Sequence, residues 1–277
     1  MRSLLLLWLL TSVLQAENKV VLITGASRGI GRATAEYLAE QGYTVYAPPR
    51  NSLDVTNPSE KLIDAIVEKE GRIDVVINNA AYALAGPLEC LTLDEMHAQM
   101  EVNFFGPIRV CQAVLPQMRK QKSGHIINIS SEQGSYGLPY GSLYTASKAA
   151  LESLSEALSI ELLPWNIKIS IVQPGMVATN FTVQLGTREV NDYSKVCQKI
   201  ADSLTEVRTP SETCQSPQEV AQFLCNVIED PNPKLRYQTS KSAEESVSHF
   251  LKDPSGQEYT NWIKSLIDPQ KSTSSDT

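Results

Sequence analysis

Short apolar runs alternate with longer amphipathic stretches along most of the chain. The runs are rich in Val, Ile and Leu, which is typical of buried strands in a parallel sheet. They cover residues 19–24, 43–47, 53–56, 73–77, 125–129, 167–172 and 235–238, and the run at 53–56 is a very short candidate.

Apolar residues at helical spacing separate these runs. One such stripe extends from Ile30 to Leu38, directly after the first run. Thr92-Leu-Asp-Glu95 has the form of a capping box and predicts a long helix to about residue 120. Pro107 should kink that helix or lie where a break is tolerated. Further helices are expected near 58–67, 143–163 and 217–228.

This alternation predicts an α/β protein with a single Rossmann-type, doubly wound parallel sheet and helices on both faces. Residues 17–240 are interpreted as one catalytic domain. It includes a substrate segment at 176–215, which lacks a clean strand and reads as an insertion with short helices. Residues 241–277 form a polar C-terminal extension that is expected to be partly flexible. Ligands of such sheets bind beyond the carboxyl ends of the strands.

The first sixteen residues differ in character from the rest. Arg2 precedes the apolar run from Leu4 to Leu10, and Gln15-Ala16 leads into a polar stretch. This order is typical of a secretory signal, with an uncleaved short membrane anchor and a misplaced start codon as alternatives. The segment therefore predicts a secretory or membrane-associated location with membrane contact through residues 1–16, or the cytoplasm if the start is misplaced or the segment is not used.

Composition narrows the class of partner. The chain has 277 residues and a formal net charge of −7 at pH 7, with no long basic run, which argues against nucleic acid. Its five cysteines and three histidines are scattered along the sequence. That spacing favours neither a disulfide framework nor a metal site, so we expect unpaired thiols and no metal.

A glycine-rich turn joins the first predicted strand to the first predicted helix. It reads Gly25-Ala-Ser-Arg-Gly29-Ile-Gly31, and such glycines let the backbone approach a pyrophosphate at the helix N-terminus. The second strand ends in Pro48-Pro49-Arg50 with no carboxylate to bind a ribose 2′-hydroxyl. With Arg28 as a second cation, this favours NADP(H) over NAD(H). Alternatively, Arg50 is a solvated turn residue.

Tyr144-Thr-Ala-Ser-Lys148 places a phenol and an ammonium four residues apart, on one face of a helix. The ammonium should lower the pKa of the phenol, which then serves as a general acid or base. The chain holds a second copy, Tyr237-Gln-Thr-Ser-Lys241. We interpret this copy as structural because thirteen residues before Tyr237 stands Leu224, whereas Ser131 occupies that offset before Tyr144.

Taken together, these motifs resemble those of the short-chain dehydrogenase/reductase family. They follow one another over residues 19 to about 180 in the family's order and include Thr24–Gly31, Asn78-Asn-Ala-Ala81, Asn103, Ile126–Ser131, Tyr144–Lys148 and Pro174-Gly175. The resemblance implies a Rossmann fold, a nicotinamide cofactor and reaction at a hydroxyl or carbonyl carbon. Two departures are the missing helix between the second strand and Asp54, and Ala81 where the family usually has Gly.

The resemblance also implies roles for particular residues. Tyr144 is the general acid/base, Lys148 lowers its pKa, Ser131 holds the substrate oxygen, and the Asn103 side chain holds a water on the proton path. Ser130 is at the wrong offset and is expected to be structural. The implied cofactor-binding residues are Gly25, Ser27, Arg28, Gly29, Ile30, Gly31, Arg50, Asp54, Val55, Asn79, Ala80, Tyr144, Lys148, Pro174, Gly175, Val177 and Thr179.

The substrate is less defined than the chemistry. Residues 104–163 resemble family members that act on steroids and retinoids, and Met176, Val177, Phe181 and Val183 either line an apolar pocket or pack the segment itself. The family also implies a homodimer or homotetramer and a small-molecule alcohol/carbonyl substrate. A non-catalytic dinucleotide sensor or scaffold is the main alternative, and an epimerase or dehydratase on the same fold is a third.

Overall fold

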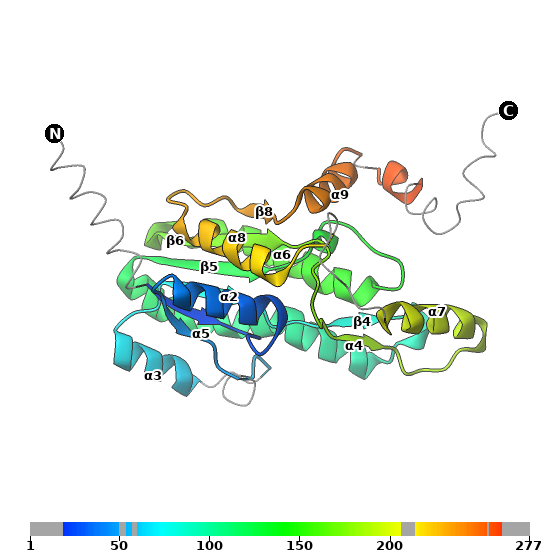
Figure 1. Ribbon diagram of the computed structural model, residues 1–277, viewed down its shortest axis with the longest axis horizontal. Coiled ribbons are helices and arrows are strands. Elements are labelled where there is room, and N and C mark those ends of the chain that lie inside the picture. The colour runs from blue at the N-terminus through cyan, green and yellow to red at the C-terminus, as the bar shows by residue number, and fades with distance from the viewer. Residues whose placement is uncertain (1–18, 50–53, 57–59, 206–213, 254, 262–277) are drawn as a thin grey trace.

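Six parallel strands form the central sheet of the computed structural model, which describes residues 19–49, 54–56, 60–205, 214–253 and 255–261 (Figure 1). The strand order is β2-β1-β3-β5-β6-β8, with every pairing parallel. The bounds are β1 Val20–Ile23, β2 Thr44–Tyr46, β3 Val75–Asn78, β5 Gly124–Ile129, β6 Ile167–Gln173 and β8 Arg236–Gln238. The predicted doubly wound fold is confirmed.

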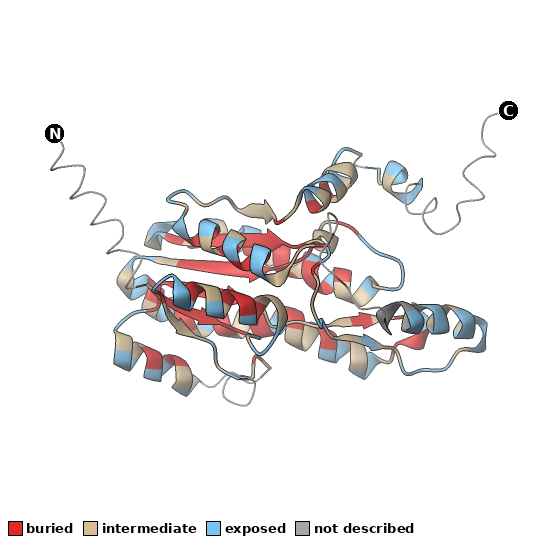
Figure 2. Cartoon of the chain, viewed as in Figure 1, coloured by how far each residue is buried: buried red, intermediate tan, exposed pale blue. Residues whose placement is uncertain are grey.

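Helices cover both faces of this sheet. On one face α2 (Gly29–Glu40) and α8 (Pro217–Glu229) pack against the strands. On the other face lie α3 (Glu60–Glu70), α5 (Gly106–Gln121) and α6 (Ser142–Glu161). The four inner strands, β1, β3, β5 and β6, are almost entirely buried, as expected when a parallel sheet is covered on both sides, whereas the edge strands β2 and β8 are partly exposed (Figure 2).

The predicted long helix after the capping box is three segments. Thr92 and Glu95 form both capping-box hydrogen bonds at the start of α4 (Leu93–Met100). A π-helical turn, Glu101–Phe105, then separates α4 from α5. Pro107 lies in the first turn of α5, where the missing N–H of proline is tolerated. Of the two alternatives for Pro107, a kink or a position where a break is tolerated, the second is therefore confirmed.

Two predictions about strands were wrong. β4 (Ala83–Ala85) and β7 (Val183–Leu185) form a separate two-stranded parallel sheet, so the 176–215 segment does contain a strand. The other error concerns 53–56, whose described residues 54–56 form a turn. There the Asp54 carboxylate accepts hydrogen bonds from the Thr56 backbone N–H and hydroxyl, and such local bonds compete with strand formation.

The remaining elements are short or peripheral. Helix α7 (Ser194–Thr205) lies in the substrate segment, and α9 (Lys241–Leu251) packs against the 3-10 turn Glu132–Gly134 with Ala243 and Val247 buried. Other 3-10 turns cover Leu88–Cys90, Leu163–Trp165 and Asn191–Tyr193. Within the part of the chain that the structure describes, none of the helices has the length and apolarity needed to span a bilayer. Residues 1–16 and Arg50 lie outside the described residues.

Candidate active site

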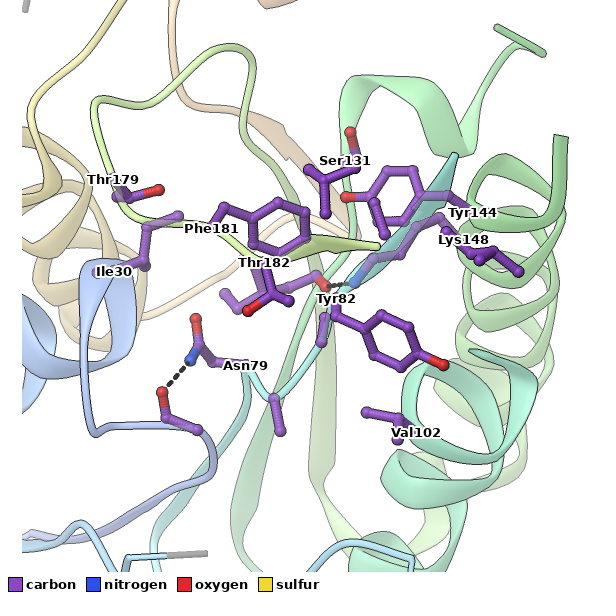
Figure 3. A pocket seen from close by; sticks show the side chains of 18 of the residues that line it. Ile30, Asn79, Tyr82, Val102, Ser131, Tyr144, Lys148, Thr179, Phe181 and Thr182 are labelled. Carbon is purple, nitrogen blue, oxygen red and sulfur yellow. Dashed lines mark hydrogen bonds between the residues drawn. The ribbon is translucent and has the colours of Figure 1, made fainter. Parts of the chain in front are cut away.

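A cavity of about 1000 Å³ opens at the carboxyl ends of the central strands. Figure 3 shows residues from several separate segments facing it. Of the residues predicted to bind or react, those that line it are Gly25, Ser27, Arg28, Gly29, Ile30, Asp54, Val55, Asn79, Ala80, Ser131, Tyr144, Lys148, Pro174, Gly175, Val177 and Thr179. The lining does not include Gly31 or Asn103, both of which are buried.

The glycine-rich turn is packed directly against the segment after β3. Gly25 has φ +67°, and a Cβ there would lie 2.7 Å from the Cα of Ala80. A Cβ on Gly31 would overlap Nδ2 of Asn79, which donates hydrogen bonds of 3.0 Å to the carbonyls of Thr24 and Gly25. Among the described residues, no side chain caps the N-terminus of α2, whose first two residues, Gly29 and Ile30, line the cavity. This cradle fits a dinucleotide pyrophosphate.

Gly31→Ala is therefore expected to weaken dinucleotide binding by at least about tenfold, because the added methyl forces Asn79 and the turn apart. Fluorescence titration with NADPH measures the change. Gly137→Ala is the matched control, since a Cβ at Gly137 meets nothing within 4 Å. Equal affinity in the two variants would contradict this view of the cradle.

Tyr144 and Ser131 approach one another at the cavity wall. Tyr144 lies in the first turn of α6, and its hydroxyl points toward the Ser131 side chain, which comes from the segment after β5 (Figure 3). Ser131 also accepts a hydrogen bond of 3.2 Å from the backbone N–H of Gln133. The ring of Phe181 packs edge-on against Tyr144 with centroids 6.0 Å apart. Two hydroxyls thus converge on one point of the cavity.

The pKa of Tyr144 is raised, whereas the sequence predicted that it is lowered. Burial is the main cause that raises it to about 12, a hydrogen bond with Ser131 opposes the rise, and the charge of Glu132 adds to it. Lys148 does not provide the expected lowering, because its ammonium donates to the carbonyl of Ile129 at 2.8 Å and lies 5.8 Å from the centre of the Tyr144 ring. Burial in turn lowers the pKa of Lys148 to about 8.

Asn103 braces the site from within the π-helical turn. Its Nδ2 donates to the Tyr82 carbonyl at 2.9 Å and to the Ser147 hydroxyl at 3.1 Å, while Oδ1 accepts from the Tyr82 N–H at 3.2 Å. Both amide donors are therefore used to join α6 to the segment leading into β4. The water-holding role predicted for this side chain stays a prediction.

The two residues interpreted as structural are confirmed as such. Ser130 is buried and donates a hydrogen bond of 2.6 Å to the carboxylate of Glu152. The hydroxyl of Tyr237 accepts from the N–H of Lys234 at 2.7 Å and donates to Asp230 at 3.1 Å, and its ring packs on Phe223. Tyr237 does not line the cavity, and Ser130, which does, uses its hydroxyl on Glu152.

Apolar side chains line the substrate side of the cavity. Met176, Val177, Phe181 and Val183 all contribute, as the pocket alternative predicted. The sequence reasoning missed Leu138, Tyr140 and Ile200. The first two lie in the Gly/Pro-rich loop before α6, where residue type alone does not distinguish a lining side chain from a solvated one.

The chain matches the family model described as short chain dehydrogenase over residues 19–57 and 51–190. The chain belongs to the short-chain dehydrogenase/reductase family. It is therefore an oxidoreductase that acts on CH–OH and C=O groups by hydride transfer, with a nicotinamide dinucleotide as cofactor.

Three relatives with curated names match most of this short-chain dehydrogenase. A 3-ketodihydrosphingosine reductase of Bacteroides thetaiotaomicron is 39% identical over 237 residues, covering 79% of this chain and 87% of the relative. Two Homo sapiens proteins follow. They are 17-beta-hydroxysteroid dehydrogenase type 1, 35% identical with coverages of 87% and 83%, and retinol dehydrogenase 8, 34% identical with 91% of each chain covered.

Solved structures agree with the fold. A short-chain dehydrogenase from Streptomyces avermitilis superposes with a TM-score of 0.76 at 31% identity, covering 91% of this chain and 99% of the other. A short-chain dehydrogenase from Burkholderia cenocepacia, solved in complex with NADP, has a TM-score of 0.69 at 25% identity and covers 88% and 98%.

Proposed function

We propose that this short-chain dehydrogenase interconverts an alcohol and a carbonyl on an apolar substrate, with NADP(H) as cofactor and Tyr144 as general acid/base. The observation that carries this proposal is the convergence of the Tyr144 and Ser131 hydroxyls on one point of the cavity. The Lys148 ammonium lines the same cavity and is held by the Ile129 carbonyl. A substrate oxygen at that point meets two donors, which is the arrangement that stabilises developing negative charge.

Proton transfer follows from the protonation state of the phenol. When bound, the dinucleotide supplies the hydride that the carbonyl carbon receives. Because the pKa of Tyr144 is raised to about 12, its phenol is protonated near neutral pH and is ready to donate to the substrate oxygen. Ser131 holds that oxygen in place. The protonated phenol is the form that acts as the acid in carbonyl reduction.

An apolar substrate is supported by the mouth of the cavity. Leu138, Tyr140, Met176 and Phe181 all line it, and each exposes between 37% and 50% of its surface. Large apolar side chains left this open at a cavity are typical of a ligand-binding surface. The three curated relatives are named for a sphingoid ketone, a steroid and retinol, which are all large apolar molecules.

The preference for NADP(H) rests on charge. The segment after β2 reads Pro48-Pro49-Arg50, without a carboxylate to repel a 2′-phosphate. Arg28 is exposed at the start of α2 and lines the cavity, where its guanidinium donates to the Thr182 hydroxyl. A 2′-phosphate offers this guanidinium a stronger, charged acceptor.

Arg28→Ala is expected to weaken NADPH binding by about ten- to a hundredfold, because a charge-assisted hydrogen bond is lost. NADH affinity should change little, since NADH has no 2′-phosphate. Parallel titrations with both cofactors measure the ratio. Arg32→Ala is the control, because Arg32 is exposed on the same helix and pairs with Glu36 away from the cavity lining. An unchanged ratio in Arg28→Ala would remove Arg28 from cofactor selection.

The proposed activity is tested by following NADPH oxidation with a panel of apolar ketones and aldehydes: a sphingoid 2-amino ketone, a steroid ketone and a retinoid aldehyde. We expect turnover of at least one. NADPH binding without turnover of any would favour the sensor or scaffold alternative. Self-association and the role of residues 1–16 in location stay predictions, which sedimentation and fractionation of the native protein would test.

A further inference from the structure

A buried acid continues the line of reactive residues along α6. Glu152 follows Lys148 by four residues, as Lys148 follows Tyr144, so the three side chains share one face of the helix. Glu152 exposes only 4% of its surface. A carboxylate this deeply buried is retained only when it is hydrogen-bonded or paired, and its partners indicate what it does.

Three donors surround the Glu152 carboxylate. Ser130 donates its hydroxyl proton at 2.6 Å and Gln173 its amide proton at 2.8 Å, both to Oε1, while Arg236 donates from Nε at 3.0 Å to Oε2. These donors belong to three neighbouring strands: Ser130 directly follows β5, Gln173 is the last residue of β6 and Arg236 is the first residue of β8. Glu152 thus joins α6 to the edge of the sheet at which the cavity opens.

The same contacts fix the two segments that carry the site. Ser130 directly precedes Ser131, and Gln173 directly precedes Pro174-Gly175. The backbones of these segments are also bonded to one another, by Ser130 N–H to the Val172 carbonyl at 2.7 Å and Glu132 N–H to the Pro174 carbonyl at 3.1 Å. At Gly134 a Cβ would overlap the Glu152 carboxylate, so the chain after Ser131 also packs closely on it.

The charge of Glu152 acts on Lys148. Burial lowers the pKa of Lys148 to about 8, and the Glu152 carboxylate opposes this lowering. The other ionisable groups near this part of α6 are Tyr144 and Glu156 on the helix itself, Glu132 on the turn after β5, and Arg236 on β8, which pairs with both Glu152 and Glu156. Glu152 differs from the other carboxylates near α6 because it is buried and lies one helical turn from Lys148.

We propose that Glu152 is a positioning residue of this site, which holds Ser131 and Pro174-Gly175 at the cavity wall and supplies the negative charge that favours the ammonium form of Lys148. The proposal rests on the function proposed above, because it assumes that Ser131, Tyr144 and Lys148 form the reactive site. The proposal has two parts, an effect of the Glu152 charge on Lys148 and an effect of its hydrogen bonds on the position of Ser131 and Pro174-Gly175. A different variant tests each part.

The charge effect is tested with Glu152→Gln. Removing the carboxylate should lower the pH at which kcat falls on the alkaline side by about one unit, because Lys148, which lines the cavity and is one of the implied cofactor-binding residues, then loses its proton at a lower pH. The pH dependence of NADPH affinity, measured without turnover, should shift in the same direction. Glu156→Gln is the control: it also removes an acid that pairs with Arg236, but an exposed one, and should leave both pH profiles in place.

The geometric effect is tested with Glu152→Asp, which keeps the charge and shortens the side chain. It should lower kcat at least about tenfold, because Ser130 and Gln173 lose their acceptor, while leaving the alkaline limb at the wild-type pH. Thermal unfolding shows whether each variant is folded. If Glu152→Gln does not fold, the test rests on Glu152→Asp. The proposal is then overturned if the pH at which kcat falls on the alkaline side differs from wild type in that variant.

A folded Glu152→Gln protein with unchanged pH profiles would likewise overturn it. The two proposals fail separately. Wild-type protein that binds NADPH but reduces no ketone or aldehyde would reject the proposed function. The pH dependence of NADPH affinity in the Glu152 variants would still test the link between Glu152 and Lys148.

Discussion

Tyr144→Phe is expected to lower kcat for carbonyl reduction by about a hundred- to ten-thousandfold, the usual contribution of a positioned general acid. The substitution removes only the hydroxyl, so the ring still packs against Phe181 and NADPH should bind as before. Stopped-flow or steady-state NADPH oxidation measures kcat, and fluorescence titration measures affinity.

The second Tyr-x-x-x-Lys sequence supplies a matched control for this variant. Tyr237→Phe also removes a phenol that stands four residues before a lysine, but on β8, where its hydroxyl bonds Lys234 and Asp230. It should cost a little stability and leave kcat unchanged. If the two variants were equally active, the proton would have to come from another group.

Lys148→Met is expected to abolish turnover and at the same time stabilise the fold. Burial lowers the pKa of Lys148 from 10.5 to about 8, so at neutral pH the folded chain holds a charge that water would solvate better. That difference corresponds to about 3 kcal/mol, of which the lost hydrogen bond to Ile129 removes about 1. The free energy of unfolding at pH 7 should rise by about 2 kcal/mol.

The sign of the pH dependence provides a second measurement for this variant. Between pH 8 and 10.5 the unfolded chain binds more protons at Lys148 than the folded chain, so wild-type stability gains from this residue as pH rises through that window. Lys148→Met should lack the gain. Lys241→Met, in the second sequence copy, removes an ammonium whose side chain is 89% exposed and should change neither stability nor its slope. A destabilised Lys148→Met protein would contradict the assigned burial cost.

Local signals predicted the parts of this site that are made locally. The glycine-rich turn is a single turn, and Tyr144 and Lys148 lie on a single helix. The sequence therefore specifies where these motifs occur and which of their groups face the ligand. The tolerated position of Pro107 in the first turn of α5 was predicted for the same reason, since proline carries its constraint in its own ring.

What could not be predicted depends on distant parts of the chain. β7 is three residues long and pairs with β4, about a hundred residues earlier, so neither shows a strand pattern on its own. The direction of the Tyr144 pKa was predicted wrongly because spacing reveals the nearby ammonium but not the burial of the phenol or the carbonyl that the ammonium contacts. Glu152 stood at the next helical turn all along, yet only its three partners distinguish it from an exposed acid.

The small β4–β7 sheet has a consequence for how substrate range diversifies. β4 directly follows the segment that packs on the glycine-rich turn. Three residue pairs between β4 and β7 join the substrate segment to this part of the protein through backbone groups. Main-chain hydrogen bonds hold such a ladder, while the side chains of the added strand determine what it contacts. A different segment with three extended residues would therefore change the lining of the cavity at this position and leave the glycine-rich turn and the Tyr144–Ser131 pair where they are.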